Sequence, residues 1–352
     1  MYTQILKKAS NLLQDATARH HALNAHNFSD GFYLSALSDY ALTAKNEELL
    51  RFIEKRLSDH KSSRRILKNI LGLSCASAAA KINNNGAYSD LFAKVELLCS
   101  NALSTVPQEY KRDAVAIINQ LLPNFLHIEE LVALCDLLSS CKNSLGDIDG
   151  KKRALLTKVR SFDDLMSDPE SGLYFPIYST KRREKLPKGD LPTYPTAYML
   201  FVYVKLRELF RDDGDYPTFI DEKISALAVT LHKRINHDGY ISFSNNSERN
   251  DSLSSNLFVY GVFSAADRLS ENTVADAEEM YQTIIEDLQL KNGLLSLPYT
   301  VSISGFGAFL PAVLNSHLRR TNDTHTALGA FALSSAAYFK RYGDRLDKEF
   351  DE

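Results

Sequence analysis

Two carboxylates in one polar segment are the residues best suited to acid–base chemistry. The segment 239–252, GYISFSNNSERNDS, holds Glu248 and Asp251 three residues apart, with Tyr240 near its start. A pair of carboxylates can supply the general acid and the general base of a hydrolytic reaction, and a tyrosine hydroxyl can donate a proton. We therefore predict catalytic roles for these three residues. The alternative is that Asp251 caps a helix and that Glu248 is surface charge.

A basic segment lies upstream, at 172–194, GLYFPIYSTKRREKLPKGDLPTY. Between residues 181 and 190 it carries five basic and two acidic side chains, among them Lys181, Arg182 and Arg183. Arginine can hold a carboxylate or a phosphate through two parallel hydrogen bonds. We predict that these three residues, with Arg249, bind an anionic substrate. The alternative is a solvated basic loop without a ligand.

Tyrosines recur in the same polar segments. Tyr178 and Tyr194 lie in the basic segment, and Tyr299 lies in a third segment, 293–307, GLLSLPYTVSISGFG. Phenol rings can stack on a sugar ring or a prenyl chain, or they can pack in a helical core with a satisfied hydroxyl. We predict that these three tyrosines contact the substrate.

Helices must position these segments. Residues 197–204 (AYMLFVYV), 257–263 (LFVYGVF) and 306–314 (FGAFLPAVL) are apolar on every side, which is typical of fully buried helices. Residues 221–235, in contrast, repeat apolar positions with the period of a helix that has one wet face. Turns containing Gly172, Gly239 and Gly293 follow the amphipathic segments, where glycine favours a left-handed helix stop. The alternation indicates hairpins of inner and outer helices.

This all-α pattern, with its DGYISFS-type turns, resembles the (α/α) toroids over about residues 128–342. These include the six-hairpin glycosidases and uronate-processing enzymes, the terpenoid cyclase and prenyltransferase rings, and the lanthionine cyclases. The resemblance implies alternating inner and outer helical hairpins in a ring, and the alternative is an open α-solenoid. We expect one helical domain over 1–352, with clearer hairpins in 126–352. Residues 1–125 read as degenerate hairpins or as a separate helical layer.

Composition excludes several classes of protein. The 352 residues carry a formal charge of −3 and are 44% hydrophobic, which suits a globular core and gives no field for nucleic acid or an anionic membrane. We expect a cytoplasmic protein, because no signal peptide and no run of 18 apolar residues is present. The four cysteines form no CxxC or Cys–His pattern, and GxGxxG, GxxxxGK[ST] and GxSxG are missing. We therefore expect no metal and no cofactor.

Three functions remain open. The first is a carbohydrate-active enzyme, a hydrolase or lyase that acts on an anionic or hydroxyl-rich small substrate, such as a glycan fragment or oligosaccharide, at the mouth of the ring. The second is a terpenoid or prenyl-processing, cyclase-like ring, in which Asp163 or Asp164 of SFDDL projects into a wide apolar cavity. The third is a helical-repeat scaffold that binds a protein or peptide partner.

Overall fold

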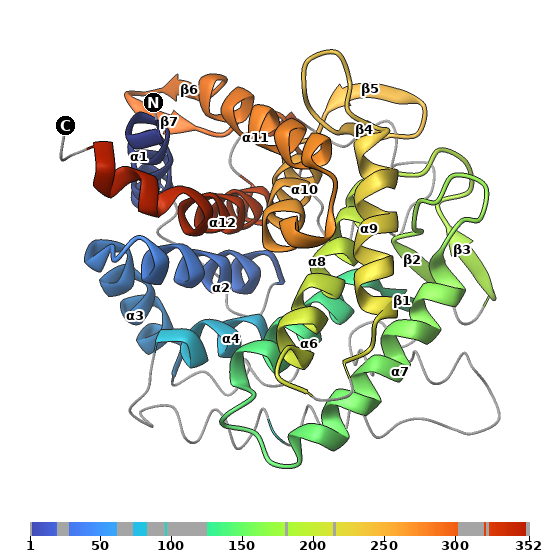
Figure 1. The fold of residues 1–352 in the computed structure, drawn as a ribbon. Coiled ribbons are helices and arrows are strands. Elements are labelled where there is room, and N and C mark those ends of the chain that lie inside the picture. Colours follow the sequence, from blue (N-terminus) through green and yellow to red (C-terminus); the bar gives the residue numbers. More distant parts are fainter. Residues whose placement is uncertain are drawn as a thin grey trace.

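The computed structural model describes residues 2–19, 28–61, 73–82, 96, 125–179, 182–213, 216–301, 320–321 and 324–349. Two layers of helices make up most of it (Figure 1). The inner helices are α2 (Phe28–Thr43), α4 (Leu73–Ile82), α6 (Ile128–Cys141), α8 (Tyr194–Phe210), α10 (Ser252–Ser264) and α12 (His325–Glu349). The outer helices are α1 (Tyr2–Arg19), α3 (Glu47–Lys61), α7 (Ile148–Met166), α9 (Phe219–His232) and α11 (Glu271–Glu286). A short 3₁₀ helix, η3 (Ala266–Arg268), follows α10.

The inner helices close into a ring. Each contacts the next in chain order from α2 to α12, and α12 returns to pack along α2. The predicted (α/α) toroid is therefore confirmed, and the open solenoid is wrong. Helices α2 and α4, from the degenerate first part of the sequence, belong to this ring (Figure 1).

Apolar patterning explains which helices lie inside. Every residue of 197–204 in α8 and of 257–263 in α10 is buried, as their all-round apolar sequence predicts. Outer helix α9 buries only one stripe, which includes Ile224, Leu227 and Leu231, and leaves the opposite side to solvent. The segment 306–314 lies outside the described residues.

Aromatic side chains fill the ring across its axis. Phe28 and Phe32 of α2 meet the ring of Tyr198 of α8 edge-on, at centroid distances of 5.9 and 6.0 Å. Phe32 also meets Phe201 of α8 at 5.7 Å. Such edge-to-face contacts add to the burial of the rings. Helices on opposite sides of the ring are thus joined through its centre.

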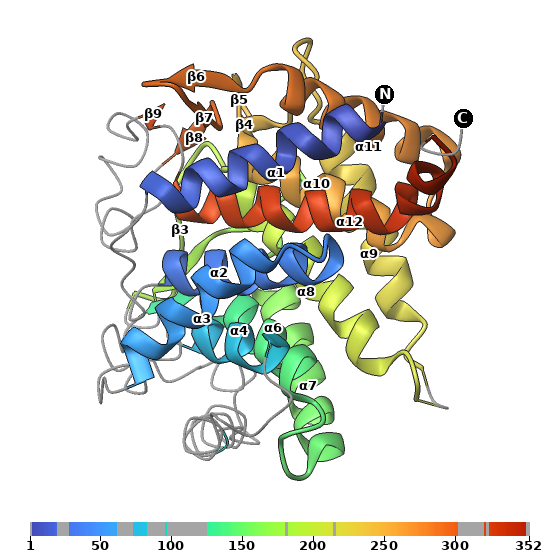
Figure 2. The same cartoon turned by 90° about the vertical axis from the view of Figure 1, so that its left-hand side faces the viewer.

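Short strands precede or link the inner helices. An antiparallel sheet is formed by β1 (Phe125–His127), β2 (Ile177–Ser179) and β3 (Glu184–Leu186). Three antiparallel pairs follow: β4 (Ser242–Ser244) with β5 (Ser247–Asn250), β6 (Gln289–Lys291) with β7 (Leu294–Ser296), and β8 (Thr300–Val301) with β9 (Arg320–Thr321). Figure 2 shows β3 and β6 to β9 towards the left-hand end of the helices.

Backbone pairings bring the starts of the inner helices to one end of the ring. The amide of Ile128, first in α6, donates to the carbonyl of Pro176 in the loop before α8. Thr193, before α8, donates to Phe243 in the loop before α10, and Ser252, first in α10, donates to Tyr299 in the loop before α12. We call this end the ring mouth. Because helix N-termini carry partial positive charge, it favours anions.

The three turn glycines take the conformation that the sequence predicts. Gly172, Gly239 and Gly293 have φ of 70°, 80° and 79°, and each follows an outer helix. Residues other than glycine rarely adopt these backbone angles. The turns mark the return from the outer to the inner layer, as predicted. Within the described residues, no helix has the length and apolar character needed to cross a membrane.

Candidate active site at the ring mouth

The two predicted catalytic carboxylates lie in different surroundings. Glu248, on β5, is 85% exposed and comes within 4.0 Å of the imidazole of His237. Asp251 is 2% exposed and caps α10, where its carboxylate accepts hydrogen bonds from the amides of Leu253 and Ser254. Asp251 therefore sits at the ring mouth, whereas the Glu248 side chain extends into solvent.

The predicted basic residues do not gather around one point. Arg182 and Arg183 lie in the turn between β2 and β3, both exposed, and the guanidinium of Arg182 lies 3.5 Å from the carboxylate of Glu184. Arg249 is exposed on β5, in a different hairpin. Lys181 lies outside the described residues.

Most of the predicted tyrosines are packed in the interior. Tyr178 and Tyr194 are each 4% exposed, and Tyr240 is fully buried with its hydroxyl donating to Asp287 at 3.1 Å. Tyr299 is half-buried and packs edge-on against Tyr240. Among these residues, Tyr194 lies at the mouth, as the first residue of inner helix α8.

Glu129 is a mouth residue that the sequence reasoning missed. It lies in the first turn of α6, is half-buried, and its buried Oε2 atom has no hydrogen-bond partner among the described residues. Burial raises the pKa of Glu129 to about 7. A carboxyl group with such a pKa is suited to give or take a proton near neutral pH.

Glu129 and Asp251 act on the same tyrosines. Burial, followed by the charges of Glu129 and Asp251, raises the pKa of Tyr194 well above its ordinary value, and Tyr198 responds to the same two carboxylates. Burial also raises the pKa of Asp251 to about 6, against its hydrogen bonds. The N-termini of α6, α8 and α10 therefore share one electrostatic environment.

An aspartate–histidine pair joins the N-termini of α2 and α12. Nδ1 of His325 is hydrogen-bonded to the carboxylate of Asp30, and the imidazole stacks on Tyr33 with an interplanar angle of 9° and a centroid distance of 5.6 Å. The side chain of His325 is 18% exposed and that of Asp30 is 6% exposed. A carboxylate that binds one imidazole nitrogen fixes the ring and its tautomer. The pair also closes the ring at its mouth.

These residues share a signal in the sequence. Asp30, Glu129 and His325 each lie within the first turn of a helix that is otherwise strongly apolar, in SDGFYLSAL, HIEELVALC and HTALGAFAL. A polar side chain at the start of a fully buried helix faces the ring mouth or a neighbouring helix start. Sequence reasoning looked for chemistry in the long loops and passed over these positions.

Asp163, which a prenyl-processing ring would project into its central cavity, lies elsewhere. Asp163 lies on the outer helix α7, where it accepts the hydroxyl of Tyr174 and pairs with Lys223 of α9. It therefore does not project into the ring, whose axis is filled at the level of Phe32 and Tyr198. This arrangement contradicts the expectation for a terpenoid cyclase.

Comparison with known proteins yields structural relatives alone. No family model and no curated protein matches the sequence. The glycoside hydrolase from family 105 of C. acetobutylicum ATCC 824 superposes with a TM-score of 0.76 at 14% identity, covering 94% of this chain and 99% of that one. A protein named as a polysaccharide lyase gives 0.75 at 14% identity, covering 97% and 98%. The unsaturated glucuronyl hydrolase of Bacillus sp. GL1, described as responsible for glycosaminoglycan degradation, gives 0.72 at 12% identity and covers 97% of each chain. The chain therefore has the (α/α)-toroid fold of these proteins.

Proposed function

We propose that the protein is an enzyme that cleaves a glycan fragment by acid–base chemistry at the ring mouth. The observation that carries this proposal is Glu129: a half-buried carboxyl at the mouth, with an oxygen that has no partner in the described part of the chain and a pKa raised by burial to about 7. In the same fold, solved structures carry the names of glycoside hydrolases and a polysaccharide lyase. Fold alone does not deliver function, so the proposal depends on this side chain.

Glu129 and His325 take the two proton-transfer roles. Below its pKa, Glu129 holds the proton that it gives to the substrate at the bond to be broken. His325, whose Nδ1 is held by Asp30, is assigned the role of accepting a proton from the attacking water. Asp30 is a positioning residue in this scheme. Asp251 keeps the start of α10 in place through its helix cap.

An anionic end on the substrate suits this site. The N-termini of the inner helices converge on the mouth, and their partial positive charges favour a carboxylate there. The unsaturated glucuronyl hydrolase among the structural relatives is named for such a sugar acid. We therefore propose an oligosaccharide with a glucuronyl-type end as the substrate class. Phe28 and Tyr198 would form the apolar floor beneath it.

The first test is the variant Glu129→Gln. It keeps the shape of the side chain and removes the transferable proton, so the rate of cleavage should fall by about 10² to 10⁴. Release of reducing ends from unsaturated glucuronyl oligosaccharides, made by lyase digestion of glycosaminoglycans, measures this rate. For the wild type, kcat should decline as the pH rises through about 7, where Glu129 loses its proton.

Glu248→Gln is the matched control. This residue undergoes the same chemical change on an 85% exposed side chain, so activity should stay within about twofold of the wild type. Equal loss in both variants, or full activity of Glu129→Gln, would remove Glu129 from the mechanism. If the wild type cleaves none of the unsaturated glucuronyl oligosaccharides, the proposed substrate class is wrong.

A further inference from the structure

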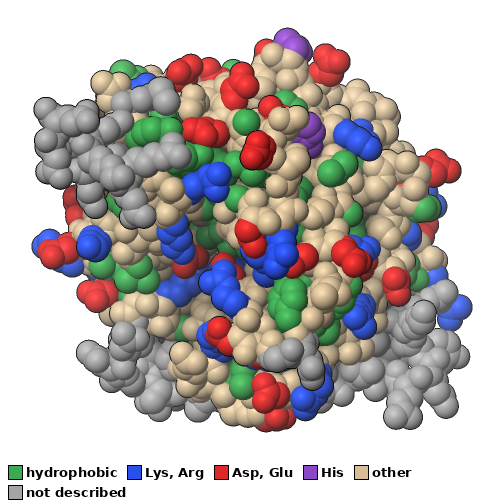
Figure 3. Space-filling view, in the orientation of Figure 1, with side chains coloured by type: hydrophobic (Ala, Val, Ile, Leu, Met, Phe, Trp, Pro, Cys, Tyr) green, Lys and Arg blue, Asp and Glu red, His purple; other side chains and the backbone are tan. Residues whose placement is uncertain are grey.

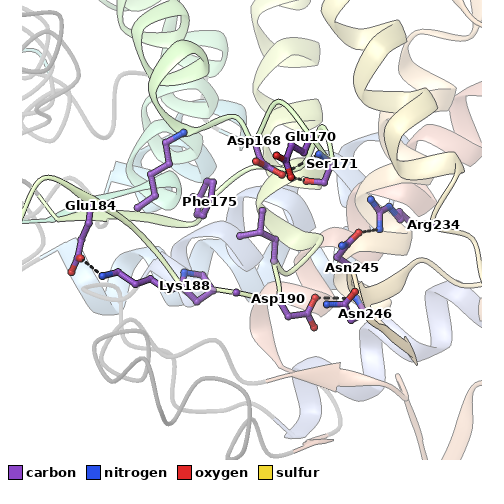
Figure 4. Close-up of a pocket in the computed structure, with 14 residues that line it drawn as sticks. Asp168, Glu170, Ser171, Phe175, Glu184, Lys188, Asp190, Arg234, Asn245 and Asn246 are labelled. Atoms are coloured by element: carbon purple, nitrogen blue, oxygen red, sulfur yellow. Dashed lines mark hydrogen bonds and ion pairs between the residues drawn. The ribbon is translucent and has the colours of Figure 1, made fainter.

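A polar cavity lies at the outer rim of the ring. Figure 4 shows it between the loop from α7 to α8 and the loop from α9 to β4 and β5. Its volume is about 730 Å³, and its lining includes Phe175, Lys185, Asp190, Arg234, Asn245 and Asn246. Cavities of this volume lie within the range that holds small-molecule ligands. None of the residues that we place at the mouth lines it.

Hydrogen bonds fix the walls of this rim pocket. The amide of Asn245 donates to the carbonyl of Leu191, and the amide of Asn246 donates to the carboxylate of Asp190 at 2.9 Å. Asp190 also accepts the hydroxyl of Ser244, and Thr193 binds the carbonyl of Phe243 through its amide. Two loops more than 50 residues apart in the sequence are thus held in one geometry. A preformed pocket loses little entropy when a ligand binds.

The cations of the rim pocket are held by neighbouring acceptors. Lys188 pairs with Glu184 at 2.7 Å, Lys185 donates to the carbonyl of Ser167 at 2.9 Å, and Arg234 donates to the amide oxygen of Asn245. The lining carries four carboxylates against these three cations, so the pocket has no net positive charge to offer a phosphate or carboxylate. Sugar hydroxyls both donate and accept, and so can join such a network at either kind of group. Phe175 adds an aromatic ring to the lining.

The rim pocket and the mouth are joined through the residues just before β2. Phe175 lines the pocket, and the next residue, Pro176, accepts the hydrogen bond from Ile128, which precedes Glu129. β2 then pairs with β1, which leads into α6. The pocket lining and the start of α6 therefore lie on neighbouring, hydrogen-bonded segments.

We infer that the rim pocket binds uncharged, hydroxyl-rich sugar units of an oligosaccharide whose reacting end lies at the ring mouth. This inference rests on the proposed function for the connection between the two sites. Binding to the pocket itself can be measured without turnover.

The test follows the amide signals of Asn245 and Asn246 by NMR during titration of the full chain with cellotetraose, xylotetraose, mannotetraose, maltotetraose and, separately, tetragalacturonate. At least one neutral sugar should shift both signals with a Kd of about 1 mM. Arg234→Ala should weaken this binding by about tenfold, the effect of losing one charge-assisted hydrogen bond. Lys233→Ala is the matched control, because Lys233 is exposed beside Arg234 and does not line the pocket.

A second variant tests the pocket with less risk of disturbing the fold. Asn246→Ala keeps the backbone amide that binds Asp190, so it removes a side chain from the pocket and leaves the loop in place. It should weaken sugar binding as well. The inference is overturned if no neutral sugar moves these signals at about 10 mM, if only tetragalacturonate does, or if Arg234→Ala and Asn246→Ala both bind like the wild type. Cleavage by the wild type with silent pocket signals would reject the pocket and leave the proposed function intact. If a neutral sugar shifts the pocket signals while Glu129→Gln stays fully active, sugar binding in the pocket stands and the proposed role of Glu129 is rejected.

Discussion

At the scale of single residues, Asp251 makes a testable link between burial and stability. Its carboxyl pKa is about 6 in the folded chain, against an ordinary value of 3.8. Between these values the folded state binds more protons than the unfolded state, so the free energy of unfolding falls as the pH rises from about 4 to about 6, by up to about 3 kcal/mol. Asp251→Asn keeps a comparable helix cap and cannot titrate.

The measurement is urea unfolding of the wild type and of Asp251→Asn at pH 4.5 and pH 7. The wild type should lose stability relative to the variant between the two pH values. Parallel behaviour would mean that the folded carboxyl titrates near its ordinary pKa. Asp251→Ala, which removes the cap itself, should be less stable than Asp251→Asn by about 1 to 2 kcal/mol at both pH values.

Sequence reasoning selected Asp251 and overlooked Glu129 for a physical reason. Asp251 stands in a conspicuous polar loop, while Glu129 sits in IEELVALC, where an acidic residue in the first helical turn is ordinary. Its half-burial arises only when α6 is enclosed by α4 and α8 in the ring. The same holds for Asp30 and His325, which meet across 295 residues of sequence.

At the scale of helices, a buried charge network joins four inner helices. Lys81 of α4 donates to Asp39 of α2 at 2.8 Å and to Asp136 of α6 at 3.1 Å, and Lys205 of α8 lies within 4.0 Å of both carboxylates. Ser35 of α2 accepts from Lys81 and donates to Asp136. Although burial opposes it, the charges of Lys81 and Lys205 hold the pKa of Asp39 below its ordinary value.

Lys81→Met tests this network. The lysine side chain is 9% exposed, so its removal leaves two carboxylates short of a buried partner and should cost about 3 kcal/mol. Arg51→Met is the control, because Arg51 pairs with Glu47 on the surface, where both side chains are more than 70% exposed, and should change stability by less than about 0.5 kcal/mol. Similar midpoints for the two variants in urea would show that the network adds nothing to stability.

The apolar pattern of a helix predicts whether it lies in the inner or the outer layer, but it does not predict which charged side chains pair between helices. The apolar inner helices α8 and α10 and the striped outer helix α9 were predictable from periodicity alone. Lys205, in contrast, interrupts an apolar helix and would be read as a solvated end. Its partners Asp39 and Asp136 come from other helices, so local sequence carries no sign of the pairing.

At the scale of the whole molecule, the seam between α12 and α2 decides whether the ring closes. Gly329 of α12 faces Phe32 and Tyr33 of α2, and a Cβ atom placed on it would lie 2.8 Å from the ring of Phe32 and 3.2 Å from the Cα atom of Tyr33. Side chains do not approach backbone this closely without displacement. The glycine thus allows the last helix to pack along the second, and we propose that this closure makes the chain a single domain.

Gly329→Ala and Gly343→Ala make the same change on one helix with opposite expected signs. Alanine at 329 must push α12 from α2, so unfolding should require about 1 to 3 kcal/mol less free energy. Alanine at 343 meets only the ring of Phe339, at the ordinary distance of 3.5 Å, so its better helix propensity should raise stability by about 0.5 to 1 kcal/mol.

Urea unfolding followed by circular dichroism measures the stability of both variants. If the ring unfolds as one unit, each variant shifts a single transition. A Gly329→Ala chain that is as stable as the wild type would show that the seam can relax, and two separate transitions would contradict the single domain.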